Sequence, residues 1–329
     1  MPKSSRSIQK IINPIYNYSA WVFSVFFIIV VLVFVTQYFQ GELSKCFTPT
    51  VLAFSVLNLI TPLVANYLYK TFSSLQNAVS TLTETNQKKW FSQQESFIFG
   101  VNTGSVATAI FLAICGGILN YGMVGCVWTG IAKFFYFLHV IVLFGALGVL
   151  GWAYWGILLF FYRLQNLKLN PQPFQAKKDE FEEISTLLFG IFSTGAILYI
   201  VAITATWISP LVDYLEVFML QYLIFPLAIV IAGFFILAQH FLHEIMKQSK
   251  KTRLNKILAF TVKLYNKWEK SQLSTHRTAI NDLLSWKEKI ETEKDFPFNF
   301  FTIVFVLAAV FLPTIALFLP TIKTIIKLF

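Results

Sequence analysis

Two apolar segments of the chain carry hydroxyl and amide side chains that could line a narrow aqueous path. Such groups can conduct water or ions through a membrane without a buried counter-ion. The alternative is structural, because Ser and Thr often bond the backbone of their own helix. The candidate pore-lining or helix-packing residues are Asn102, Thr103, Ser105 and Thr108 in one segment and Ser193, Thr194 and Thr204 in another.

Glycines in the same regions have the spacing of a helix-packing seam. Gly100 and Gly104 are four residues apart, so they share one face of a helix, and Gly145 and Gly148 form a similar pair in another apolar segment. Small side chains let two backbones approach closely inside a membrane. We predict that these four glycines mark a helix seam.

A group of potential metal ligands follows the last of six consecutive apolar blocks. His240, His243 and Glu244 lie at positions i, i+3 and i+4, so a helix would place them on one face. Their order differs from the zinc-protease pattern His-Glu-x-x-His, which places a catalytic Glu between the ligands. Interfacial side chains near lipid headgroups are the simpler interpretation. We expect no metal, no cofactor and no catalytic residue, and an enzymatic role is disfavoured.

A basic run then extends from Lys247 to Lys270 and includes one acid, Glu269. Its cations are Lys247, Lys250, Lys251, Arg253, Lys256, Lys263, Lys267 and Lys270. Anionic lipid headgroups at the cytoplasmic face are the first candidate partner, since each nearby charge contributes about 1 kcal/mol of attraction. A cytosolic protein or a small anionic ligand is the second. Nucleic acid is disfavoured, because Tyr265 and Trp268 could stack on bases but fit an apolar helix face equally well.

Long apolar blocks must position all of these residues. Six of them are long enough for a helix to cross hydrocarbon: residues 19–39, 48–69, 97–119, 134–162, 185–207 and 217–238. Residues 298–319 form a seventh block, in which Pro313 removes a backbone donor and is predicted to act as a hinge. We favour a kinked crossing for this block over a re-entrant segment.

Composition and charge agree with a membrane protein. The chain has 329 residues, of which 56% are hydrophobic and 13% are charged, whereas a soluble domain has about 25% charged residues. Twenty-two of the 26 Lys and Arg residues fall on one side when the connections are assigned to alternate sides. The positive-inside rule then predicts a cytoplasmic N-terminus in the plasma membrane, or in the inner membrane of a bacterium.

The polar interval between blocks six and seven has its own helical pattern. Apolar residues recur at helical spacing from Leu254 to Trp268 and again from Ile280 to Ile290, with turn-forming residues around Ser274 between them. This pattern predicts a cytoplasmic amphipathic helical hairpin, or one long helix with a weak point near Ser274.

The sequence therefore predicts an all-α, polytopic integral membrane protein with about seven transmembrane helices, namely three hairpins and a Pro-kinked C-terminal helix. Residues 1–239 would form a six-helix region with short outer loops, 240–297 a cytoplasmic basic segment, and 298–329 the last helix and tail. The favoured function is an oligomeric channel, in which identical subunits associate and the cytoplasmic helices control conduction. The alternatives are a non-conducting anchor or scaffold for cytosolic partners, and a lipid-interacting enzyme or carrier at the inner interface.

Overall fold

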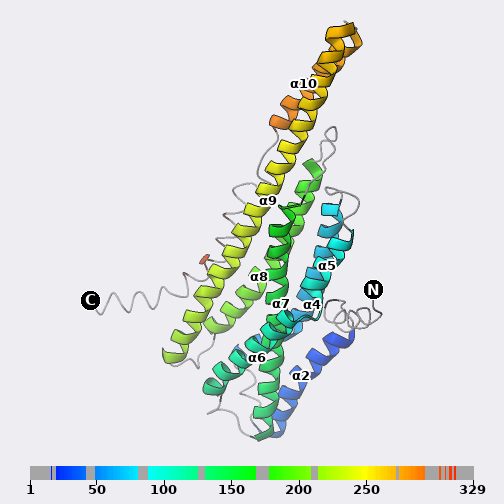
Figure 1. Ribbon diagram of the computed structural model, residues 1–329. Coiled ribbons are helices and arrows are strands. Elements are labelled where there is room, and N and C mark those ends of the chain that lie inside the picture. The colour runs from blue at the N-terminus through cyan, green and yellow to red at the C-terminus, as the bar shows by residue number, and fades with distance from the viewer. Residues whose placement is uncertain are drawn as a thin grey trace, which may run out of the picture.

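A computed structural model gives the fold of most of the chain (Figure 1). The residues that it describes are Tyr16, 20–41, 49–80, 88–124, 130–167, 178–208, 214–271, 274–292 and the single positions 304, 308, 311, 312 and 315. Within these residues every regular element is a helix. The prediction of an all-helical protein is confirmed.

The helices form an elongated bundle and alternate in direction, except that α6 continues in the general direction of α5 (Figure 1). They are α2 (Ala20–Phe39), α4 (Pro49–Ser80), α5 (Lys88–Phe99), α6 (Thr103–Val124), α7 (Gly130–Leu164), α8 (Lys178–Ile208), α9 (Tyr214–Ser271) and α10 (Ser274–Glu291). Local sequence explains several of their ends. Pro49 stands at the first position of α4, where its missing N–H costs nothing. Gly41, just beyond α2, adopts φ 70°, a left-handed conformation that glycine accepts without strain.

Five helical stretches within the described residues are long and apolar enough to cross a membrane. They are Val22–Phe39, Lys89–Ile118, Gly130–Leu164, Glu183–Val201 and Ala228–Ser271. These stretches overlap the predicted spans one, three, four, five and six. Span two forms much of α4, which is not among the five. Only the single positions 304, 308, 311, 312 and 315 of span seven are described, and its Pro313 hinge is not, so the count of seven stays a prediction.

The third predicted span is not one continuous helix, contrary to expectation. α5 ends at Phe99 and α6 begins at Thr103, with Gly100, Val101 and Asn102 between them. The sixth predicted span, in contrast, belongs to a helix that continues well beyond the predicted end of the span. No helix end marks the predicted boundary at residue 240, because α9 runs unbroken for 58 residues from Tyr214 to Ser271.

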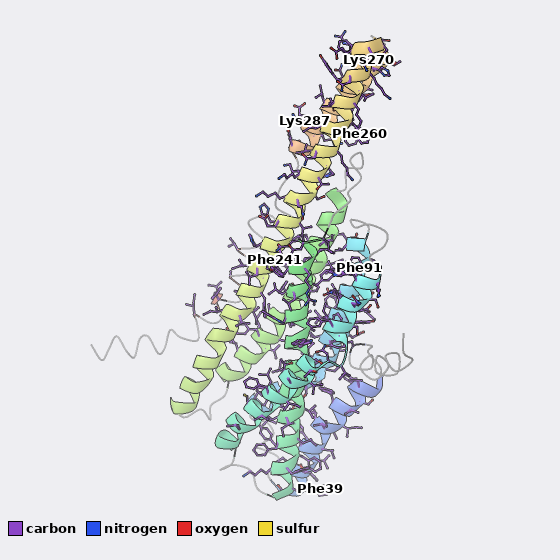
Figure 2. The ribbon with its side chains drawn as sticks, viewed as in Figure 1. Phe39, Phe91, Phe241, Phe260, Lys270 and Lys287 are labelled. Atoms are coloured by element: carbon purple, nitrogen blue, oxygen red, sulfur yellow. The ribbon has the colours of Figure 1, made fainter. Side chains whose placement is uncertain are left out.

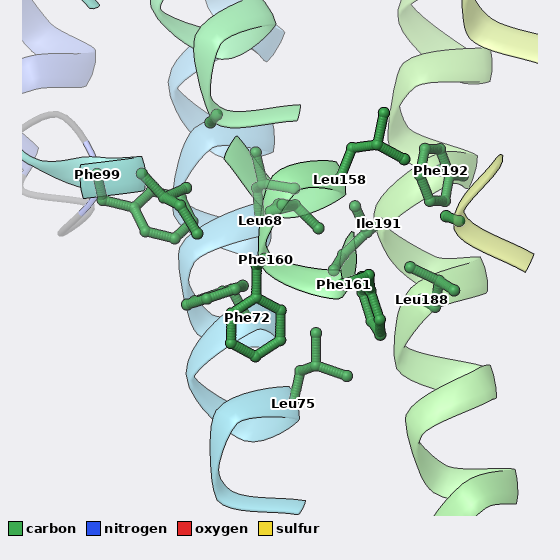
Figure 3. Close-up of a cluster of buried hydrophobic side chains, with 14 of the residues drawn as sticks. Leu68, Phe72, Leu75, Phe99, Leu158, Phe160, Phe161, Leu188, Ile191 and Phe192 are labelled. Carbon is green, nitrogen blue, oxygen red and sulfur yellow. The ribbon is translucent and has the colours of Figure 1, made fainter. Parts of the chain in front are cut away.

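Aromatic side chains fill the centre of the bundle where α4, α5, α7 and α8 meet (Figure 3). Phe160 of α7 is fully buried, and its ring centroid lies 5.2 Å from that of Phe72 and 5.5 Å from those of Trp90 and Phe161. Apolar surface gains little by leaving lipid for protein, so close van der Waals packing of this kind is what holds membrane helices together. The shape of these rings therefore sets how the four helices fit.

The second half of α9 projects beyond the bundle, and α10 packs back along it (Figure 1). We call residues 247–271 of α9 together with α10 the arm. Ile257, Leu283 and Ile290 are buried between its two helices. At the base of the arm, Lys250 Nζ donates to the carbonyl oxygen of Glu291 at 2.9 Å, which caps the end of α10. The arm is thus a helical hairpin, and its side of the membrane stays a prediction.

Candidate functional site

The break between α5 and α6 is closed by a reciprocal cap around Asn102. The backbone N–H of Ser105 donates to Asn102 Oδ1 at 2.9 Å, and the backbone N–H of Asn102 donates to Ser105 Oγ at 3.2 Å. Each side chain therefore satisfies a backbone donor at the start of α6, as in a capping box. The side chains of Asn102 and Ser105 hold the helix terminus and do not point to an external ligand.

The carbonyl oxygens at the end of α5 also accept hydrogen bonds at this break. Asn102 Nδ2 donates to the carbonyl oxygens of Phe97 at 2.6 Å and Gly100 at 3.2 Å, and the indole N–H of Trp152 donates to that of Phe97 at 3.1 Å. Non-helical backbone at membrane depth needs such partners, because lipid supplies none. The break is therefore a structural feature held by its own hydrogen bonds.

Replacing Asn102 by alanine should destabilise the protein by about 1–3 kcal/mol, the usual range for losing a cap and leaving buried backbone groups unbonded. The measurement is the free energy of unfolding of the detergent-solubilised chain by denaturant titration. The matched control is Thr103→Ala, because the neighbouring Thr103 is exposed. Equal loss in both variants would contradict the capping role.

Three further hydroxyl groups of the predicted path bond within their own helices. Thr108 Oγ1 donates to the carbonyl oxygen of Gly104 at 3.0 Å, and Ser193 Oγ donates to that of Phe189 at 2.7 Å. Thr194 Oγ1 donates to the carbonyl oxygen of Ile191 at 2.6 Å and also contacts the hydroxyl of Tyr154. The Thr204 side chain lies outside the described residues. These bonds favour the packing interpretation of the hydroxyl residues over pore lining.

The hydroxyl residues of the third and fifth predicted spans also lie on different sides of α7. Trp152 bonds to the α5–α6 break, whereas Tyr154 contacts Thr194 of α8. Residues two apart in a helix point in nearly opposite directions. Within one chain, the hydroxyl residues of the third and fifth spans therefore do not face a common path.

Glycines at the α6–α7 contact allow a close approach of the two backbones. A Cβ atom added to Gly148 would lie 2.6 Å from the carbonyl oxygen of Thr108 and 2.7 Å from Cα of Ala109. At Gly104 it would collide with the ring of Trp152. A Cβ atom added to Gly145 would make only ordinary van der Waals contacts. One added to Gly100 would collide with the carbonyl oxygen of Ser96, which lies in the same helical turn.

Two further glycines of α6 and α7 lie close to neighbouring helices, although no sequence motif singles them out. A Cβ atom would collide with the ring of Phe144 at Gly116 and would lie 2.8 Å from Ile98 Cγ1 at Gly156. No small-residue motif marks Gly116, because a leucine stands four residues before it and an asparagine four residues after it. The facing aromatic and aliphatic side chains are what identify both positions.

The histidine group at the base of the arm does not form a metal centre in the structure. His240 is exposed, and His243 and Glu244 are half-buried on α9. No group of three or more His, Cys, Asp or Glu side chains that could hold a metal is found among the residues described. The predicted metal-free interpretation of this group is therefore kept as an expectation.

The basic run follows the length of the arm and divides by exposure. Lys247, Lys251, Lys263, Lys267 and Lys270 are exposed, whereas Lys250 and Lys256 are half-buried and Arg253 is buried. Figure 2 shows Lys270 at the far end of the arm, well away from the bundle. The exposed cations are thus spread from the base of the arm to its tip.

Apolar side chains of the arm are only partly covered by its two helices. The predicted helical spacing is present, yet Leu258, Val262, Tyr265 and Leu284 are exposed while Ile257, Leu283 and Ile290 are buried. A shallow groove of about 250 Å³ also lies between the helices, lined by Phe260, Leu264, Ala279, Asp282, Leu283 and Trp286. Phe260 is visible on this part of α9 in Figure 2. Phe260 could not be singled out from the sequence, because it falls outside the main apolar stripe of α9.

The outer lysines of the arm lie far along α9 from the first cation of the basic run. At a rise of 1.5 Å per residue, Lys263 lies roughly 24 Å along α9 beyond Lys247, the first cation of the run. Attraction to lipid headgroups falls off within the Debye length, which is about 8 Å at physiological salt. If α9 leaves the membrane at Lys247 and stays straight and upright, Lys263, Lys267 and Lys270 lie beyond the reach of the headgroups.

Comparison with known proteins adds no family to these observations. No family model matches the sequence, and no curated protein or solved structure is significantly similar to it.

Proposed function

We propose that this chain is a membrane-anchored docking protein whose arm binds a protein partner on the cytoplasmic side. The observation that carries the proposal is the unbroken α9, which packs in the apolar bundle and then extends into a basic, partly apolar hairpin. An anchor needs a membrane part that is firmly packed and a binding part that clears the bilayer. Both properties belong to this one helix.

The interior of the bundle also favours an anchor over a conducting path. Its centre is packed with large apolar side chains such as Phe72, Phe160 and Phe161, all of which are fully buried. A path for ions needs polar groups that remain available to the ion. The side chains of Ser105, Thr108, Ser193 and Thr194 donate their hydrogen bonds to helix carbonyls instead.

Photo-crosslinking of the full-length chain in intact cells tests this function. A photoreactive amino acid at position 262, which is exposed, or at position 279, which lines the groove between α9 and α10, should give a covalent product with a second protein, seen as a discrete band and identified by mass spectrometry. The control is the same amino acid at Phe111, which is 65% exposed on the lipid-facing side of α6. We expect no soluble protein to be crosslinked there.

Two outcomes would contradict the docking function. One is an equal yield of the same products from Phe111 and from the arm, and the other is the absence of any protein product from the arm. Unitary currents from the purified chain in planar bilayers would favour the channel instead.

A further inference from the structure

The groove between α9 and α10 has the dimensions of a site for large apolar side chains. Phe260 and Leu264 line it from α9, and Trp286 lines it from α10. Phe260 remains 46% exposed although it lies at the contact of two helices. A third helix could cover these side chains, since amphipathic helices bind such grooves through apolar residues at i, i+3 or i+4, and i+7.

Lysines border the groove along its α9 edge. Lys256 precedes Phe260 by four residues, while Lys263 and Lys267 follow it by three and seven, so the three lysines share the Phe260 face of α9. They span roughly 16 Å, about three turns of helix. An occupant of the groove therefore meets a row of positive charges on this side.

The α10 edge of the groove has a different character. Asp282 contributes a carboxylate to the lining, and Lys289 Nζ lies 5.1 Å above the centre of the Trp286 ring. Acidic groups of an occupant would be repelled by Asp282 and attracted by the α9 lysines. The charge pattern thus favours one orientation of a bound helix, with its acids over α9.

Two other occupants fit these charges less well. A second copy of the chain would bring its own lysines to the same groove, and like charges at an interface are unfavourable. A lipid headgroup does not reach Lys263 and Lys267 if the membrane surface lies near Lys247, because both residues then lie roughly 24 Å or more along the helix from it. An acidic partner protein has neither difficulty.

From this arrangement we infer that the groove binds an acidic amphipathic helix of the partner protein. The apolar face of that helix covers Phe260, Leu264 and Trp286, and its Asp or Glu residues lie along Lys256, Lys263 and Lys267. This inference rests on the proposed docking function, and it names the partner chemistry and the face of the arm that is used.

Selection from a library of helical peptides tests the inference. The full-length chain is held in nanodiscs of uncharged phosphatidylcholine and exposed to displayed random peptides of about 18 residues, five helical turns. Enriched peptides should share Asp or Glu beside apolar residues at helical spacing. Their affinity for the full-length chain should fall by about tenfold or more in Phe260→Ala, as expected for loss of a central apolar anchor.

Matched variants test whether the effect depends on the three lysines beside the groove or on the net charge of the arm. The triple change Lys256→Glu, Lys263→Glu and Lys267→Glu should also weaken binding by about tenfold or more, since it places like charges opposite the peptide acids. The control triple Lys247→Glu, Lys251→Glu and Arg277→Glu alters net charge equally and should leave the affinity within about twofold, because rim charges far from a contact contribute little. Circular dichroism verifies that α9 and α10 remain helical in every variant.

A second control uses the opposite face of α9. Leu258 lies two residues from Phe260 and is exposed, so Leu258→Ala removes apolar surface without touching the groove. Its peptide affinity should match that of the unaltered chain. A loss caused by Leu258→Ala and not by Phe260→Ala would overturn the assignment of the groove.

Other results would overturn the acidic-helix inference in different ways. Enriched peptides without acids, no enriched family at all, or displacement of the peptides by single-stranded RNA at the lysine row would each exclude it. Arm crosslinks that persist in the groove variants would exclude it too, yet would leave the docking function standing. The absence of arm crosslinks would instead remove the docking function itself.

Discussion

Replacing Phe160 by alanine is expected to lower the free energy of unfolding by about 3–5 kcal/mol, the range for truncating a fully buried aromatic side chain. Phe160 has no exposed surface, and its ring lies against Phe72, Trp90, Phe91 and Phe161. Three helices lose a shared contact at once, because these rings come from α4, α5 and α7. Denaturant titration in detergent, followed by tryptophan fluorescence, measures the change.

Phe111→Ala is the matched control for the aromatic core. It removes the same side chain from α6, where the ring is 65% exposed and contacts lipid in a membrane. We expect its free energy of unfolding to change by less than about 1 kcal/mol, since surface substitutions away from special features have small effects. Equal destabilisation of both variants would show that Phe160 is not a centre of packing.

Gly148→Leu should have a comparably large effect by overfilling the α6–α7 contact. The nearest atoms to an added Cβ belong to the backbone of Thr108 and Ala109, which cannot rotate away as a side chain could. Overpacking costs about 1–3 kcal/mol and more where backbone must shift. The expected results are a lower midpoint of thermal unfolding and a reduced yield of monodisperse protein in size-exclusion chromatography.

Gly151→Leu, one turn away on α7, is the matched control and is not expected to lower the stability. Nothing lies within 4 Å of a Cβ atom added to Gly151. Leucine is a better helix former than glycine by about 0.8–1 kcal/mol, so this variant should be unchanged or slightly more stable. If Gly148→Leu were as stable as Gly151→Leu, the close approach of α6 and α7 would be wrong.

The membrane character of the fold could be predicted because it depends on local composition. Uninterrupted apolar stretches such as residues 134–162 have few conformations open to them in lipid, and helices satisfy every backbone group without a partner. The amphipathic spacing from Leu254 to Trp268 likewise indicated a helix. Both signals are contained in short windows of sequence.

The break at Asn102 could not be predicted from a short window. Its energy depends on Trp152, which lies far along the chain and bonds to Phe97. The same limit applies to the hydroxyl residues: Ser193 and Thr194 could be recognised as polar, but their separation from Ser105 by α7 depends on tertiary packing. The sequence pattern identified the residue types and left their mutual placement open.

The continuity of α9 was missed for a different physical reason. A change from apolar to polar residues at His240 resembles a domain boundary in composition, yet nothing there stops a helix: no proline or glycine interrupts residues 234–271. Helical propensity therefore carries α9 past this change in composition. A change from apolar to polar residues indicates a change of environment. The end of a helix requires a separate signal, such as a proline or a glycine.

An unjointed α9 has a mechanical consequence. A partner that pulls sideways on the tip of the arm exerts a torque on a single rod, since α9 has no hinge residue between its buried Phe235 and the exposed Lys270. Any sideways displacement at the tip must either bend this rod or swing its inner end against Tyr162 of α7, whose ring centroid lies 5.6 Å from that of Phe241. A sideways force on the tip of the arm is therefore transmitted to the contact between α7 and α9.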